Sequence, residues 1–188
     1  MSQLLPLAPL GLIGALRLMR TSGTLVISSE VAARRDQWCY NLRVLAAPIL
    51  IDDTDWLGGV LKASPTLLYN ALTPVRWSTK GYEYIDHHWV QAELSDGGII
   101  TVDKTYTGNI HIRHYTSVKP LRLRMEKHNV MMTSVWLASE ICEQPIQIDT
   151  LIRVAEAFPN EYRLLDDNCK HLSEAIAKCF HLKTFTRR

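Results

Sequence analysis

One cysteine near the end of the chain stands in a position suited to nucleophilic chemistry. Cys169 follows Asn168 in the stretch YRLLDDNCKHLSEAIAKC, residues 162–179. Asn168 is a favourable N-cap residue and predicts a helix that runs to about Lys178. Backbone N–H groups at the start of a helix stabilise a thiolate relative to a thiol. Because the thiolate is the reactive form, Cys169 is our candidate nucleophile.

A nucleophilic cysteine needs a base, and the base needs a polar group that orients it. The stretch SDGG, residues 95–98, predicts a hairpin with Asp96-Gly97 as a two-residue type I′ turn. In that register His88 lies at the end of the apolar, core-facing side of its strand, and Asp103 is its diagonal neighbour on the same side. We therefore predict His88 as the base and Asp103 as the orienting residue, with His114 as the alternative for the third position.

Both β-strands and α-helices are needed to position these residues. Residues 75–115 are rich in aromatic and β-branched residues, and with a second turn at Thr107-Gly108 they predict at least three antiparallel strands. Apolar spacing and capping residues predict helices in three further regions: two short pieces within 52–72, one within 121–143, and one from Asp149 or Thr150 to about Phe158. Residues 24–51 carry no element that we can assign. The fold class is therefore α+β.

Composition and charge restrict the domain organisation and the partners. The chain has 188 residues and a net charge of +2, which fits one domain and gives no basis for nucleic-acid binding. We divide it into an apolar arm, residues 1–20, and a single domain, residues 21–188. The arm either folds onto the domain or contacts a membrane surface. The four cysteines are widely spaced, so we expect no structural zinc site and a reducing, cytoplasmic compartment, with membrane association through the arm as the alternative.

The stretches that carry the candidate residues resemble two motifs of one enzyme family. DDNCKHL, residues 166–172, resembles the NC box of the lecithin:retinol acyltransferase-like (LRAT-like) proteins. DHHWVQAEL, residues 86–94, resembles the companion H box, whose histidine-aromatic step aligns with His88-Trp89. These proteins belong with the NlpC/P60 enzymes in the papain-like superfamily. The order of histidine before cysteine is similar to that of the circularly permuted branch.

The resemblance implies a circularly permuted papain-like fold, in which an antiparallel sheet of three or more strands packs on the helix that carries Cys169. It implies a cysteine-dependent acyltransferase or hydrolase that acts through a Cys169 thioester on an ester or amide, including acyl lipids, without a metal or organic cofactor. His171 matches the histidine of the NC box and would support the helix start or line the cleft. The second histidine of the family has no equivalent here. Two alternatives stay open: a thiol peptidase, amidase or deconjugating protease with a peptide-like substrate, and a non-catalytic interaction protein that retains the two boxes.

Overall fold

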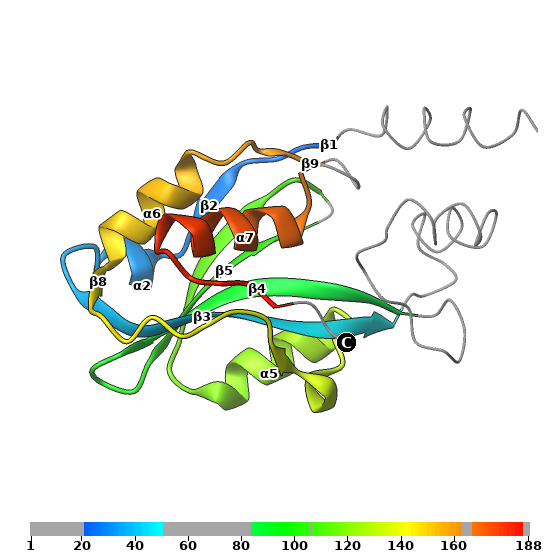
Figure 1. Cartoon of the computed structure of the whole chain (residues 1–188), viewed down its shortest axis with the longest axis horizontal. Coiled ribbons are helices and arrows are strands. Elements are labelled where there is room, and N and C mark those ends of the chain that lie inside the picture. The colour runs from blue at the N-terminus through cyan, green and yellow to red at the C-terminus, as the bar shows by residue number, and fades with distance from the viewer. Residues whose placement is uncertain (1–20, 51–83, 106, 163–166, 186–188) are drawn as a thin grey trace, which may run out of the picture.

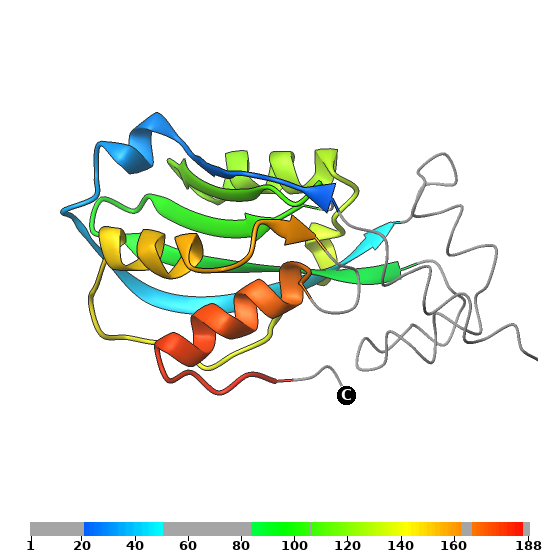
Figure 2. The same ribbon diagram turned by 90° about the horizontal axis from the view of Figure 1, so that it is seen from above.

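A central sheet with helices on both faces forms the core of the molecule (Figures 1 and 2). The structure is a computed structural model and describes residues 21–50, 84–105, 107–162 and 167–185. The arm predicted at residues 1–20 and the helices predicted within 52–72 lie outside the described residues. The elements of the described chain are β1 Thr21–Ser22, β2 Leu25–Ile27, α2 Ser29–Ala32, β3 Trp38–Leu50, β4 Tyr84–Leu94, β5 Ile99–Lys104, β6 Ile110–Tyr115, α5 Val118–Lys127, the 3₁₀ turn η1 Met132–Ser134, β7 Trp136–Leu137, β8 Ile146–Gln147, α6 Ile148–Glu156, β9 Glu161–Tyr162 and α7 Cys169–Cys179.

The main sheet has the strand order β2-β6-β5-β4-β3-β7, with β8 paired to β3. All neighbours are antiparallel except β2 and β6, which run parallel. β1 pairs with β9 in a separate two-stranded sheet, directly before the segment that leads into α7. The α+β class and the three consecutive antiparallel strands β4, β5 and β6 agree with the sequence prediction.

Two hydrophobic clusters hold the layers together, one on each face of the sheet. We call these the α7 face, which α6 and α7 cover, and the α5 face, which α5 covers (Figure 1). Side chains alternate along a strand, so even-numbered residues of β4 such as Val90 pack with Leu172 and Ile176, while Trp89 packs with Leu121. Each fully buried leucine or isoleucine contributes about 1.5–3 kcal/mol.

The β4–β5 hairpin differs from the prediction by one residue. The N–H of Leu94 donates to the carbonyl of Gly98 over 2.8 Å, which leaves three residues in the loop, and Gly97 takes a φ of 82°. A two-residue turn would place Asp96 at positive φ as well, whereas the longer loop confines that conformation to a glycine. The Asp96 side chain stabilises this loop by accepting a hydrogen bond of 2.9 Å from the N–H of Gly98.

This one-residue shift changes which side chains share a face. Trp89, not Val90, lies opposite Asp103. Asp103 is therefore on the α5 face with His87 and Trp89, and the predicted arrangement of Asp103 beside His88 is wrong. The β5–β6 hairpin also has a three-residue loop, with Gly108 at a φ of 87°. The second shift cancels the first, so His114 does lie on the same face as His88, as predicted.

The helix predicted within residues 121–143 is wrong beyond residue 127. α5 ends at Lys127, and the following chain runs along β3 instead. Backbone hydrogen bonds join Met131 to Pro48, Ala138 to Val44 and Cys142 to Leu42 over 2.7–2.8 Å. These partners lie on β3, in the region that the sequence left unassigned, so the apolar spacing was satisfied by strand contacts rather than by a helix. The helix predicted from Asp149 or Thr150 is present as α6, with Gln147 as its N-cap.

Candidate active site

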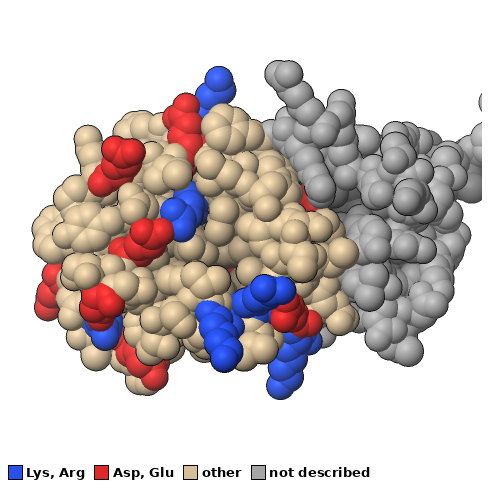
Figure 3. Space-filling model, turned by 90° about the horizontal axis from the view of Figure 1, so that it is seen from below, with Lys and Arg blue, Asp and Glu red and all other residues tan. Residues whose placement is uncertain are grey.

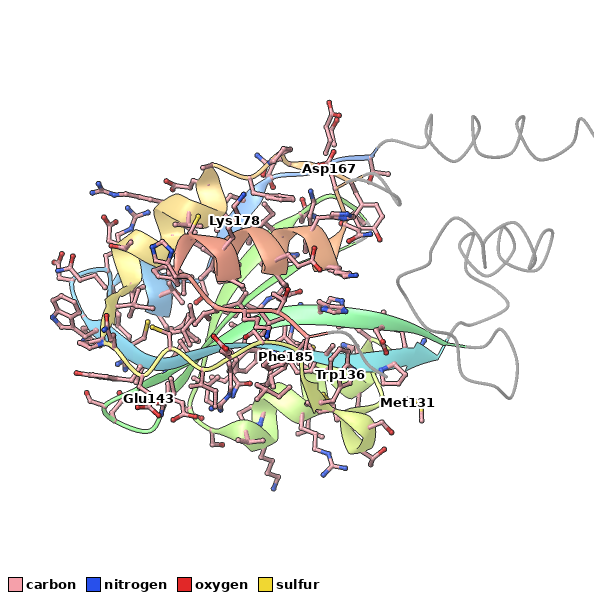
Figure 4. All side chains as sticks on the ribbon, viewed as in Figure 1. Met131, Trp136, Glu143, Asp167, Lys178 and Phe185 are labelled. Atoms are coloured by element: carbon pink, nitrogen blue, oxygen red, sulfur yellow. The ribbon has the colours of Figure 1, made fainter. Side chains whose placement is uncertain are left out.

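The start of α7 holds Cys169 as predicted. The side-chain oxygen of Asn168 accepts hydrogen bonds from the backbone N–H groups of Lys170 at 2.9 Å and His171 at 3.2 Å. It also lies 2.9 Å from Nδ1 of His171, so His171 supports the helix start. Asp167 and Lys178 mark the two ends of this helix in Figure 4. The local sequence thus fixes Cys169 as the first residue of the helix.

The Cys169 sulfur lies at an open edge of β4. β4 pairs with β3 as far as Tyr84, but its pairing with β5 stops at Trp89. In an antiparallel strand every second residue directs its backbone N–H to the same neighbouring strand. The N–H of Leu94 donates to Gly98 on the β5 side, so the N–H of His88, six residues earlier, also points to the β5 side. Beyond the last pair this N–H donates to the Cys169 sulfur, as does the N–H of Lys170. A backbone N–H lies in the plane of the sheet, so side chains of either face can reach the sulfur.

The side chain that bonds the sulfur belongs to His87. Burial opposes the charged thiolate, but the hydrogen bond to the His87 side chain, the charge of His87 and the two backbone donors together lower the pKa of Cys169. Burial also opposes the charged imidazole, yet the hydrogen bond to Cys169, the charge of Cys169 and that of Asp103 raise the pKa of His87. The two groups therefore favour a thiolate–imidazolium pair.

His88 has a different environment. His88 is only 6 % exposed, and its imidazole meets the Trp136 ring edge-on at 6.0 Å. Burial, followed by the charges of His87, Lys170 and His171, lowers the pKa of His88 to about 3. The sequence prediction paired Cys169 with the His88 side chain. The structure instead places the backbone N–H of His88 and the side chain of its neighbour at the sulfur.

The third predicted residue, Asp103, does lie near the histidine of the pair. It is opposite Trp89, whose ring stacks on His87 at 6.1 Å and 20°. Its carboxylate accepts a 2.7 Å hydrogen bond from Arg113 and is buried, and its charge raises the pKa of His87. Trp89 and Asp103 together favour one orientation and the protonated state of His87.

The alternative third residue, His114, is not at this site. His114 pairs with Ile100 on β5. Ile100 is four positions, or about 13 Å, from Lys104, the last residue of β5 and the end of that strand nearest the site. The Nε2 atom of His114 lies against Gly98 in the hairpin at the opposite end of the strand. The structure brings Cys169, His87 and Asp103 together and leaves His114 apart.

A buried lysine beside the site was not found by sequence reasoning. Lys104 is 1 % exposed, and its Nζ donates to the carbonyls of Pro159 and Glu161, each at 2.6 Å, and lies 4.7 Å from the centre of the Phe158 ring. Burial lowers the pKa of Lys104 to about 8, against the charges of Asp167, Cys169 and Glu161.

Lys104 thereby links the end of β5 to residues 159–161, which precede α7 in the chain. Tyr162 directly follows Glu161, and burial together with the charge of Cys169 raises the pKa of Tyr162. Lysine in a strand normally indicates a solvent-facing position, so the sequence carried no signal for this role.

The described residues contain no cluster of three or more histidine, cysteine or acidic side chains that could hold a metal ion. Among the helices of the described ranges, none has the length and apolar character needed to cross a bilayer. Comparison with known proteins adds no relative: no protein-family model, no curated protein and no solved structure matches this chain.

Proposed function

We propose that the protein is a cysteine-dependent acyltransferase or hydrolase that forms a thioester on Cys169. The observation that carries the proposal is the hydrogen bond between Cys169 and His87, which lowers the pKa of the thiol and raises that of the imidazole. Such a pair keeps the sulfur ionised near neutral pH, which is the state that attacks a carbonyl. His87 thus takes the role that the sequence assigned to His88.

The reaction begins when the Cys169 thiolate attacks the carbonyl carbon of an ester or amide. The carbonyl oxygen takes up the negative charge, and the backbone N–H of Cys169 at the start of α7 stabilises it, since the N–H groups of Lys170 and His171 are bonded to the Asn168 side chain. The bond to the leaving group then breaks as the His87 imidazolium donates its proton to the leaving oxygen or nitrogen. The products of this step are a Cys169 thioester and a neutral His87.

The second half of the reaction transfers the acyl group. Neutral His87 accepts a proton from water, a hydroxyl or an amine as that acceptor attacks the thioester carbonyl. The carbon–sulfur bond breaks, the acyl group leaves with the acceptor, and the thiolate–imidazolium pair is restored. Asp103 is the positioning residue in this scheme, since its charge favours protonated His87.

A circularly permuted papain-like fold accords with this mechanism. Its support is the chain order, with the histidine strand β4 before the cysteine helix α7, and the packing of α7 on the antiparallel strands β4 and β5. The resemblance of residues 86–94 and 166–172 to the H and NC boxes of the LRAT-like proteins supports the same assignment. Its histidine, however, moves by one position to His87.

Acylation by p-nitrophenyl acetate tests the proposal. We expect a burst of p-nitrophenolate equal to the protein concentration and an acetyl group on the peptide that contains Cys169, identified by mass spectrometry. Cys169→Ala should abolish both. Cys179→Ser is the matched control, because Cys179 is the exposed cysteine at the other end of α7. Equal bursts from the native protein and Cys169→Ala would refute the proposal.

A further inference from the structure

Beside the active site, the α5 face carries more cationic groups than carboxylates. Asp103 is the central acid, and it lies directly opposite His111 on β6. Arg113 is two residues further along β6, on the same face, and donates to the Asp103 carboxylate over 2.7 Å. Among Asp103, His111 and Arg113, the one carboxylate is therefore already paired with a guanidinium.

The α5 helix and its C-terminal end add two more groups. Burial first and then the charge of Arg113 lower the pKa of His111, and the charges of Arg124 and of His128, the C-cap residue, act in the same direction. Conversely, burial first and then the charges of Arg124 and Arg113 lower the pKa of His128. His111 and Arg124 are half-buried, while His128 is exposed, so the group is open to solvent on one side.

The charges of this group do not balance. Two arginines face one carboxylate, and within the described part of the chain no carboxylate forms an ion pair with Arg124. The two histidines have lowered pKa values, so near neutral pH they add neutral N–H donors rather than charge. Half-buried guanidinium groups lose hydration and regain that free energy when an oxyanion binds them, often through two parallel hydrogen bonds. In the view of the α5 side, basic side chains gather over this helix (Figure 3).

We propose that Arg113, Arg124, His111 and His128 form a binding site for an oxyanion, the phosphate or carboxylate group of a ligand. The site goes beyond the proposed acyl chemistry and does not require it. It lies on the face that carries His87, two strand spacings or about 10 Å from Trp89. The charge of Arg113 acts on His87, so an anion held by Arg113 would also act on that imidazole.

Titration with inorganic phosphate and, separately, with acetate tests the site. Imidazole proton and nitrogen NMR signals of His111 and His128 report binding, and isothermal calorimetry gives the affinity. We expect saturable binding of at least one anion, with shifts at both histidines. The relative affinity of phosphate and acetate distinguishes a phosphate ligand from a carboxylate ligand. No saturable shift with either anion would overturn the proposal.

The variant Arg124→Gln should weaken binding at least tenfold. Arg122→Gln is the matched control: it removes the same charge from the same helix, but Arg122 is exposed and bonded to Glu126 at 2.7 Å. The control should bind within about twofold of the native protein, since nearby exposed charges contribute little through solvent. Equal weakening by both variants would show general charge attraction and overturn the site. Thermal unfolding of each variant confirms that it is folded before its affinity is compared.

Discussion

The pH at which His88 becomes protonated gives a quantitative test of which histidine forms the ion pair with Cys169. In the folded protein the pKa of His88 is lowered to about 3, from 6.5 for an unperturbed histidine, so the unfolded chain binds the proton and the folded chain does not at intermediate pH. Because the folded-state pKa is depressed, this contribution to stability is complete above the unfolded pKa and is lost as the pH falls toward the folded one. At pH of about 5 the loss is about 2 kcal/mol, from roughly 1.4 kcal/mol per unit over the 1.5 units below 6.5.

Urea unfolding followed by tryptophan fluorescence measures this loss. We would compare the native protein with His88→Asn at about pH 8 and about pH 5. The variant has no imidazole to protonate, so its free energy of unfolding should fall by about 2 kcal/mol less than that of the native protein. Any packing defect of the variant is the same at both pH values and cancels. If His88 were instead the imidazolium partner of Cys169, its pKa would be raised, and the variant would lose more stability than the native protein on acidification.

Three further substitutions test the elements that hold the site. Asn168→Ala removes the cap of α7 and should cost about 1 kcal/mol in urea unfolding and slow the alkylation of Cys169; unchanged reactivity would contradict the role of the helix start. Gly98→Ala would place a Cβ atom 2.5 Å from Nε2 of His114 and should destabilise the protein by about 1–3 kcal/mol, whereas a neutral effect would argue against the three-residue loop. Leu172→Ala leaves a cavity between α7 and the sheet and should cost about 2–5 kcal/mol; a loss below about 1 kcal/mol would mean that α7 is not packed as described.

Local signals in the sequence predicted the cysteine helix correctly. Asn168 caps α7 through contacts with Lys170 and His171, which are close along the chain, so no tertiary information was required. The β4–β6 strands were also recognised, because turn residues and alternating side chains are short-range features. The class of the fold followed from these elements.

The pairing of the site residues could not be read from the sequence for a specific reason. A turn of two or of three residues fits SDGG, and the choice decides which side chains of β5 share a face with His87 or with His88. The sulfur, moreover, lies at the open edge of β4, in the plane of the sheet. A histidine on either face can reach it, so choosing His88 because its side chain faces the core was the wrong criterion.

β3 was missed because its sequence lacks strict alternation. It pairs with other strands along both edges, and its register with β4 shifts between Tyr40 and Arg43, where Asn41 takes a φ of 52°. A strand of this kind has no period of two that extends over its length. Its pairing with residues 130–142 depends on contacts far apart in the chain.

The central claim is that His87 ionises Cys169, and the pH dependence of Cys169 alkylation tests it most directly. Iodoacetamide labelling rates would be measured for the native protein, His87→Ala and His88→Ala. His88→Ala keeps the backbone N–H that bonds the sulfur. We predict an apparent pKa below the ordinary value of about 8.5 in the native protein, a higher pKa and slower labelling near neutral pH in His87→Ala, and nearly native behaviour in His88→Ala. Native labelling in His87→Ala, with loss of reactivity in His88→Ala, would contradict the account.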